Sequence, residues 1–550
     1  MSDTTAPTTL RPRRRNILLI TTDQQRYDAL GCNGGAVART PCLDGLAAAG
    51  VNYRRAMNQN VVCMPARASI LTGQYPSTHG VVANGVPLPP DSPSVAAHLH
   101  DHGYRTALLG KAHFEPAFDL RRRWFENRMV TDDTTGPYRG FDHLELAMHT
   151  AVPRWWHYED WLHRTHPDEV DGFVTLFGPG GMNQEAGGDT GAPEVAHNAV
   201  AREHYHTDWV ADRTMAFLYT VASNEPWFVW MSFPDPHHPW DPPASELGRV
   251  PWRQLDLPPA HPGSDEACRK VLAGKPAHWL GYYDGTFSNL EGGPPRFVPA
   301  QLTHDQLREV NAMTHIENEL IDEACERVLS HIAAKGWSHR TDVLYTTDHG
   351  ELQGDFGLLF KGPYHCEALM HIPLIWRPAA DADVAPAEIS APVGQVDIAP
   401  TLCGIAGVPV PEWVQGSALP VDPLDGDGEG SGRERVLTEW DSQFGHIGMH
   451  LRSMWRDDWL VTAYLPSSGD HPGSTEMSEV AAQLGGAVLD ATVRYDGTEG
   501  ELYNLADDPY QWQNLWDDPT ARSTRDDLLA DLGEHLPPVR NPLLAVEAPA

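Results

Sequence analysis

The sequence predicts an α/β fold built around a large, mostly parallel sheet. Four short apolar runs each lead directly into a cluster of polar residues, and helix-like segments lie between these runs. Continuous apolar runs of this length suit strands that are covered on both faces, as they are in a parallel sheet. Strands that alternate with helices are typical of α/β domains, and 550 residues allow one large domain with a smaller one beside it.

Each predicted strand ends at residues that can carry chemistry. In parallel sheets, ligands bind beyond the carboxyl ends of the strands, so the four polar clusters should share one edge and form a single composite site. The strands and the residues after them are 16–22 before Asp23 and Gln24, 104–109 before Lys111 and His113, 227–233 before His237 and His238, and 342–347 before Asp348 and His349.

Helical patterns fill much of the chain between these strands, at 40–49, 94–102, 201–221 and 303–334. Two long segments, 114–200 and 241–300, are irregular and rich in Trp, His, Pro or Gly. We expect both to be insertions over the active edge of the sheet, where substrate loops tend to lie. Their tryptophans either stack on a substrate or anchor the loops to the core.

The last part of the chain predicts a small C-terminal α+β subdomain with an antiparallel sheet. A Gly- and Asp-rich stretch at 422–432 is typical of a linker, and short strand patterns follow it. The terminal segment could reach a neighbouring subunit, which leaves a homo-oligomer open. The predicted division is a flexible tail at 1–11, a catalytic domain at 12–425, a C-terminal subdomain at 433–516, and a helix and tail at 517–550.

The composition argues against several classes of partner. A formal net charge of −35 disfavours nucleic acids and anionic membranes. No apolar run approaches the roughly 20 residues of a membrane span, and the apolar run that follows the N-terminal arginines is too short for a secretion signal. The seven cysteines form no C-x-x-C pair, as expected for reduced thiols. We therefore expect a cytoplasmic protein.

The segment CMPAR, which contains Cys63 and Arg67, is the most informative motif. Pro is favoured in the first turn of a helix, and the free N–H groups there attract anions. Arg67 adds a fixed, forked cation. A buried Cys before an ordinary helix would give the same pattern, so this motif depends on the rest of the chain.

Two further sets of residues suit a site for an anion and a metal. Asp23, Gln24, Asp348 and His349 offer the oxygen and imidazole ligands that divalent cations bind. Each residue of the two sets alone also fits a purely structural role, because Asp is common in turns, Lys on the surface and His in structural contacts. Their shared place at predicted strand ends favours the metal interpretation. The candidate anion-binding residues are Arg67, Lys111, His113, His237 and Lys361.

The order of these motifs resembles that of the type I sulfatases, which belong to the alkaline-phosphatase-like superfamily. The likeness covers roughly residues 14–516 and includes C-x-P-x-R, an L-T-G-x-Y-P-x-x-H-G run, G-K-x-H, P-H-x-P, D-H-G and a following Lys. The resemblance implies an α/β/α sandwich. It also implies that a formylglycine-generating enzyme converts Cys63 into formylglycine, whose hydrate attacks the sulfur of an organic sulfate monoester.

The resemblance also implies the roles of the other residues. Asp23, Gln24, Asp348 and His349 would ligate one divalent metal. Arg67 and Lys111 would steady the nucleophile, and His113 would act in the collapse of the intermediate. His237 and Lys361 would contact the sulfate, and one of them would protonate the leaving group.

Two positions depart from the common sulfatase pattern. Gln24 stands where many sulfatases have a second Asp. The loss of one carboxylate makes Mn²⁺ as suitable a metal as Ca²⁺. An Asp-Gln pair at this position is also similar to that of phosphonate monoester hydrolases, relatives that act on phosphorus diesters. Lys111 and His113 favour sulfate monoesters instead, because those relatives usually replace both residues. Ala66 stands where Ser is common, but the maturation enzyme mainly recognises the Cys, Pro and Arg.

Two hypotheses from other classes remain at this point. If Cys63 is never modified, the chain would bind a metal or a sulfate ester without turnover. A cysteine hydrolase that pairs Cys63 with His113 or His237 is a further alternative, but it would leave the predicted metal ligands unexplained.

Overall fold

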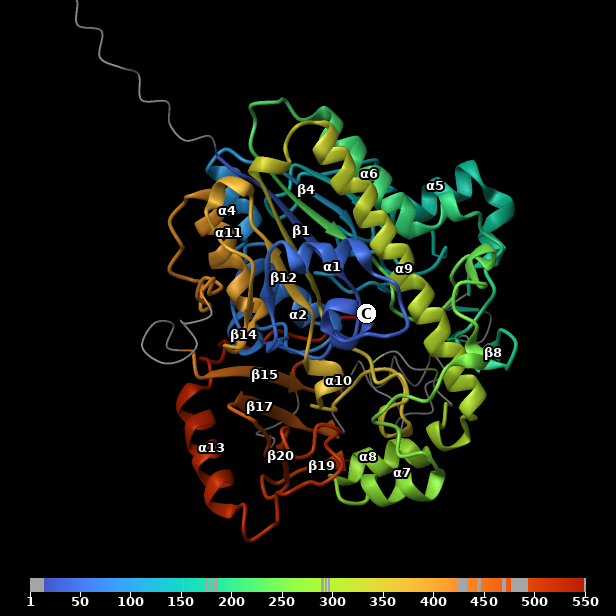
Figure 1. Ribbon diagram of the computed structural model, residues 1–550, viewed down its shortest axis with the longest axis vertical. Helices are drawn as coiled ribbons and strands as arrows, with labels where there is room; N and C mark the ends of the chain where they lie inside the picture. Colours follow the sequence, from blue (N-terminus) through green and yellow to red (C-terminus); the bar gives the residue numbers. More distant parts are fainter. Residues whose placement is uncertain are drawn as a thin grey trace, which may run out of the picture.

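A computed structural model gives the architecture of the protein (Figure 1). The predicted tail at 1–11 and almost all of the predicted linker at 422–432 lie outside the part that the structure describes. That part is residues 14–548 except 152, 175–176, 179–180, 183–185, 288–290, 292–293, 295–296, 423–432, 443–446, 467–470 and 476–492.

The core is an eight-stranded, mostly parallel sheet, which confirms the predicted fold class. Its central strand β1 (Asn16–Thr22) pairs in parallel with β10 (Trp227–Ser232) and with β11 (Thr341–Thr347). Next to β10 lie β4 (Arg105–Gly110) and then β5 (His143–Leu146), both parallel. The other edge continues through the antiparallel strand β12 (Leu374–Arg377) to β2 (Val51–Tyr53) and β13 (Ala387–Ile389).

Helices cover both faces of this sheet, because alternate residues of β1 enter two different cores. Leu18 and Ile20 pack in the core that contains residues of α1 (Pro41–Ala48), α6 (His206–Thr220) and α9 (His304–Ala334). Ile17 and Leu19 pack in the core that contains residues of α2 (Cys63–Thr72), α4 (Val95–Asp101) and α11 (Ile398–Ala406). This is the α/β/α sandwich that the resemblance implies.

Helix α9 shows how local sequence sets an element. Thr303 accepts the N–H of Gln306, whose side chain bonds back to Thr303, so the helix begins with a capping box. None of the helices in the described ranges is long and apolar enough to cross a membrane.

A second sheet lies in the lower left of the molecule in Figure 1. Its four strands are antiparallel and lie in the order β15 (Arg435–Asp441), β17 (His450–Arg456), β18 (Trp459–Leu465) and β20 (Gly500–Asn504). Helix α13 (Arg522–His535) packs on this sheet and shares a small core with it. The predicted C-terminal α+β subdomain is therefore confirmed.

The chain after α13 returns to the catalytic part. The backbone N–H of Arg540 donates to the Ser77 carbonyl, and that of Glu547 donates to the Gly85 carbonyl. The last described residues accordingly lie near the middle of the molecule, where Figure 1 marks the C-terminus.

The segments predicted as insertions hold short elements, and the first of them also supplies strand β5 of the main sheet. The remaining helices and strands are α3 (Pro76–His79), α5 (His157–Thr165), α7 (Asp265–Leu272), α8 (Ala277–Asp284), α10 (Glu367–Met370), β3 (Ala56–Met57), β6 (Phe177–Gly178), β7 (Gly181–Met182), β8 (Ala186–Gly187), β9 (Ala192–Pro193), β14 (Val393–Gly394), β16 (Ile447–Gly448) and β19 (Val493–Arg494).

Candidate active site

The polar clusters that follow β1, β4, β10 and β11 meet at one edge of the sheet, as the strand-end argument predicts. The backbone N–H of Gln24 donates to Asp348 Oδ1 at 3.0 Å, although 324 positions separate the two residues. Lys111 Nζ bonds to Asp23, and Lys361 Nζ contacts His237 Nε2 at 2.6 Å. Parallel packing of the strands therefore places the four clusters in contact.

Cys63 lies at the centre of this group, as the first residue of α2, with 1% of its surface exposed. Its Sγ contacts His349 Nε2 at 3.1 Å, Lys361 Nζ at 3.4 Å, Asp23 Oδ1 at 3.6 Å and Lys111 Nζ at 3.9 Å. Burial, followed by the negative charge of Asp23, raises the pKa of the thiol to about 12. An unmodified Cys63 is thus a neutral thiol at neutral pH.

Three of the four predicted metal ligands form a buried cluster. The ligand atoms of Asp23, Asp348 and His349 lie within 4.8 Å of one another and of the Cys63 sulfur. His349 Nδ1 is 2.9 Å from the Gly350 carbonyl, so Nδ1 carries the proton and Nε2 turns its lone pair to the cluster. Two carboxylates and such an imidazole fit a divalent cation.

The fourth predicted ligand, Gln24, is oriented by a neighbour. Its Nε2 donates to Glu351, and its Oε1 accepts from Lys361 Nζ at 2.6 Å. The amide oxygen therefore faces the site and the amide nitrogen faces away from it. Gln24 also has a left-handed backbone, with φ at 64°.

Arg67 is fully buried and braces both carboxylates. Its Nε donates to Asp348 Oδ2 at 2.8 Å, and its Nη2 is 3.6 Å from Asp23 Oδ2. Burial alone would raise the pKa of Asp23, but the neighbouring positive charges, those of Lys111 and Arg67 foremost, hold it well below its usual value. Asp23 is thus a carboxylate, with oxygens available to a cation.

The histidines predicted at the site differ in their contacts. His113 has only 4% of its surface exposed, and neither imidazole nitrogen has a hydrogen-bond partner among the described residues. Burial, and then the charge of Lys111, holds the pKa of His113 well below its usual value. His237 accepts from Lys361, whereas its neighbour His238 bonds to Glu194.

Comparison with known proteins assigns the chain to a family. A sequence profile of the Sulfatase family matches residues 15–408, well over half of the chain. The chain belongs to the sulfatase family. As a member of it, the protein is a sulfuric ester hydrolase.

Individual relatives of this sulfatase agree with that assignment. An arylsulfatase of Clostridium perfringens strain 13 is 28% identical over 414 residues, which cover 74% of this chain and 77% of the relative. The uncharacterized sulfatase YidJ of Escherichia coli K12 is 23% identical over 537 residues, 96% of this chain and 88% of that protein. The crystal structure of a phosphonate monoester hydrolase of Agrobacterium radiobacter superposes with a TM-score of 0.71 at 23% identity, covering 95% and 96% of the two chains. This last likeness shows the shared fold.

Two residues that contact the candidate site were missed in the sequence. His149 follows β5 and contacts Lys111 Nζ through Nε2 at 2.8 Å. Glu351 lies three residues after Asp348 and holds the Gln24 amide. A signal for His149 existed, because LEL followed by AMHT repeats the pattern of an apolar strand that leads into polar residues.

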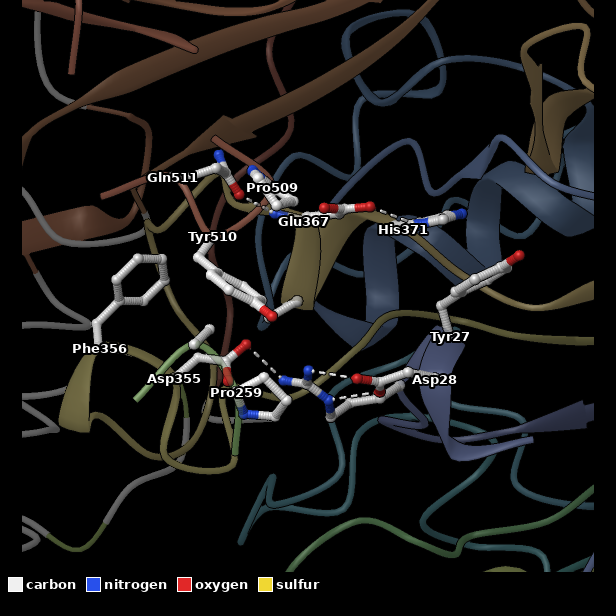
Figure 2. Close-up of a pocket in the computed structure, with 13 residues that line it drawn as sticks. Tyr27, Asp28, Pro259, Asp355, Phe356, Glu367, His371, Pro509, Tyr510 and Gln511 are labelled. Carbon is white, nitrogen blue, oxygen red and sulfur yellow. Dashed lines mark hydrogen bonds and ion pairs between the residues drawn. The ribbon is translucent and has the colours of Figure 1, made fainter. Parts of the chain in front are cut away.

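A separate cavity of about 230 Å³ lies beside the loops that follow the predicted metal ligands (Figure 2). Arg26 bonds there to Asp28 and Asp355, and its Nη1 also donates to the Glu351 carbonyl at 3.1 Å. Figure 2 shows Tyr27, Tyr510 and Phe356 around this space. None of the predicted site residues lines the cavity, and Arg26 is the lining residue that bonds to the Glu351 backbone.

Proposed function

We propose that this sulfatase hydrolyses an organic sulfate monoester to sulfate and an alcohol or phenol. The nucleophile would be formylglycine made from Cys63, and one divalent metal, Ca²⁺ or Mn²⁺, would act with it. The observation that carries the proposal is the position of Cys63. It starts a helix and lies within 4 Å of two lysines, a carboxylate and an imidazole.

Formylglycine hydrate would supply one hydroxyl that attacks sulfur and a second whose ionisation expels sulfate and restores the aldehyde. The metal, held by Asp23, Gln24, Asp348 and His349, would offset negative charge and lower the pKa of the attacking hydroxyl. A thiol has no second hydroxyl, so maturation would decide whether the enzyme turns over.

The chain's own cations would hold the substrate. Lys111 and Lys361 point their ammonium groups at residue 63, so a sulfate group at that residue would meet both of them. Arg67 would fix Asp348 and the backbone around Lys111, because it donates to that residue's carbonyl at 2.9 Å. Within the part of the chain that the structure describes, the His113 nitrogens have no hydrogen-bond partner, which suits a group that acts on substrate oxygens or on the hydrate.

We assign the proton for the leaving group to Lys361. His237 accepts from Lys361 at Nε2, and its Nδ1 faces the carbonyl of His238. Burial also holds the pKa of His237 well below its usual value. His237 is therefore neutral with its own proton committed, and it would orient the Lys361 ammonium toward the departing oxygen.

The alternative of a phosphonate monoester or phosphodiester hydrolase has one specific observation in its favour, the amide ligand Gln24. Lys111 and His113 favour sulfate, as the sequence indicated. The other two hypotheses fare less well. A cysteine hydrolase needs a thiolate, but the pKa of Cys63 is raised to about 12, and the imidazole on Sγ is that of His349, a metal-ligand candidate. A binding protein without turnover would require Cys63 to remain unmodified.

A paired rate comparison tests the proposal. The protein is produced together with a formylglycine-generating enzyme, and an aryl sulfate and an aryl phosphonate monoester are assayed with Ca²⁺ and with Mn²⁺. Cys63→Ala serves as the blank. Faster Cys63-dependent release from the sulfate is expected, and faster release from the phosphonate would establish the alternative. Mass spectrometry of the tryptic peptide that ends at Arg67 checks the modification, and an unmodified Cys throughout would overturn the enzymatic mechanism.

A further inference from the structure

His149 lies between two residues of the proposed mechanism. Its Nε2 is 2.8 Å from Lys111 Nζ, and its ring stacks on the ring of His237, with centroids 4.0 Å apart and planes inclined by 19°. The other face of His237 stacks on His238, at 4.2 Å and 19°. His237 is thus held between two parallel imidazoles.

We propose that His149 is a positioning residue, which fixes the Lys111 ammonium by accepting its hydrogen bond and fixes the His237 ring by stacking. This inference rests on the proposed function, because Lys111 and His237 are the groups through which His149 would act. It concerns neither the metal nor the modification of Cys63.

The acceptor role follows from the partners of Lys111. An ammonium only donates hydrogen bonds, so the nitrogen of His149 that faces it is the lone-pair nitrogen. Lys111 Nζ otherwise contacts Asp23 and, at 3.9 Å, the Cys63 sulfur. Without His149, the attraction of Asp23 would dominate and draw the ammonium away from the substrate group at residue 63.

The stacking role follows from the ring arrangement. His237 and the Gln24 amide oxygen both accept from Lys361, so the angle of the His237 ring helps to set the direction of the Lys361 ammonium. His238 is itself fixed by Glu194, and His149 supplies the second face. Loss of the His149 ring would leave His237 free to tilt on one side, which would loosen the proton donor for the leaving group.

Two substitutions separate the roles. His149→Phe keeps an aromatic ring for His237 but removes the acceptor for Lys111, whereas His149→Asn keeps an acceptor and removes the ring. His143→Asn is the matched control, because it makes the same kind of change in a histidine on β5. The side chain of His143 is partly exposed and contacts Glu145. Thermal unfolding of every variant identifies loss of fold.

The kinetic readout uses aryl sulfates with good and poor leaving groups. We expect His149→Phe to lower kcat/KM roughly 10- to 100-fold for both, because a hydrogen bond to a charged group is lost. His149→Asn should lose more on the poor leaving group than on the good one. In a Lys111→Ala background, His149→Phe should change kcat/KM by less than about threefold.

A binding readout is independent of turnover. In the Cys63→Ala protein, which cannot react, His149→Phe should weaken the binding of inorganic sulfate about tenfold in calorimetry. Failure of the proposed function would leave wild-type protein inactive on sulfates with this binding effect intact. The positioning role is overturned if folded His149→Phe keeps its sulfate affinity and rate, or if its loss is undiminished in the Lys111→Ala background.

Discussion

Glu351 orients the amide of Gln24 relative to the candidate metal site. Glu351 Oε2 accepts from Gln24 Nε2, while Glu351 Oε1 accepts the backbone N–H groups of Phe360 at 2.5 Å and Gln353 at 3.2 Å. In Glu351→Gln, the remaining oxygen would stay with the two backbone N–H groups. The new amide nitrogen would then face the amide nitrogen of Gln24, donor against donor.

Gln24 relieves that conflict only by turning its amide over. Its nitrogen would then face Lys361, a second donor, and its oxygen would leave the candidate metal site. Loss of a group that orients a ligand typically lowers metal affinity 10- to 100-fold, about 1.4–2.7 kcal/mol. The cost of one unsatisfied buried polar group, about 1–3 kcal/mol, is of the same size.

The assay is a titration of metal-free enzyme with Mn²⁺ and with Ca²⁺, followed by calorimetry and by recovered activity. The decisive variant is the double substitution Glu351→Gln with Gln24→Glu. In it, one oxygen of the carboxylate at position 24 accepts from the amide at position 351, and the other oxygen stays at the site. We expect the exchange to restore most of the affinity that Glu351→Gln loses. Unchanged metal affinity in folded Glu351→Gln would refute the argument that Glu351 orients Gln24.

Three further predictions concern stability. Burial lowers the pKa of His79 to about 3, so unfolded chains take up a proton at this residue below about pH 6.5 and folded chains do not. The free energy of unfolding should therefore fall as the pH is lowered from 5.5 to 4.5. In denaturant titrations, the fall should be roughly 1.4 kcal/mol per pH unit larger than in the His79→Gln variant. Glu501→Gln removes the counter-ion of the buried Lys275 ammonium, which lies 3.5 Å from Glu501, and should lower the free energy of unfolding by about 3–5 kcal/mol. The double variant with Lys275→Met should recover most of that free energy. Equal stabilities of Glu501→Gln and the wild type would contradict this. Gly110→Ala should abolish soluble, active protein, because Gly110 has φ +103° and a Cβ there would overlap the carbonyl oxygen of Ser232 on β10. Gly404→Ala is the control: nothing lies within 4 Å of its Cβ position, so this variant should fold normally.

The fold and most of the site could be predicted because both depend on local patterns. An apolar run that ends in polar residues marks a buried strand and its ligand-binding end at once, and four such runs were sufficient to place Asp23, Lys111, His237 and Asp348 together. Strand β5 was missed because it has only four residues and two of them are half-exposed, as expected at the edge of a sheet. His149 was missed with it, since its position depends on that strand.

Glu351 could not be predicted for a different reason. A Glu three residues after an Asp-His pair has no local signature, and its importance comes from a contact with Gln24, 327 positions away. The same applies to the ring of His149, whose partner His237 lies on another strand end. Contacts that orient a ligand are properties of packing, so they appear only when the strands are assembled.

The charge of the site explains how so acidic a chain can attract an anion. The net charge of −35 is spread over the whole protein, and salt screens exposed charges beyond about 10 Å. At the site, the positive charges of Arg67, Lys111 and Lys361 face the carboxylates of Asp23, Asp348 and Glu351, so the two sets are equal in number. A divalent ion would therefore leave a local excess of positive charge. These groups are buried, where charges act in a low dielectric with little screening, so the local excess outweighs the distant negative surface. A sulfate ester that reaches the strand ends therefore meets a positive field.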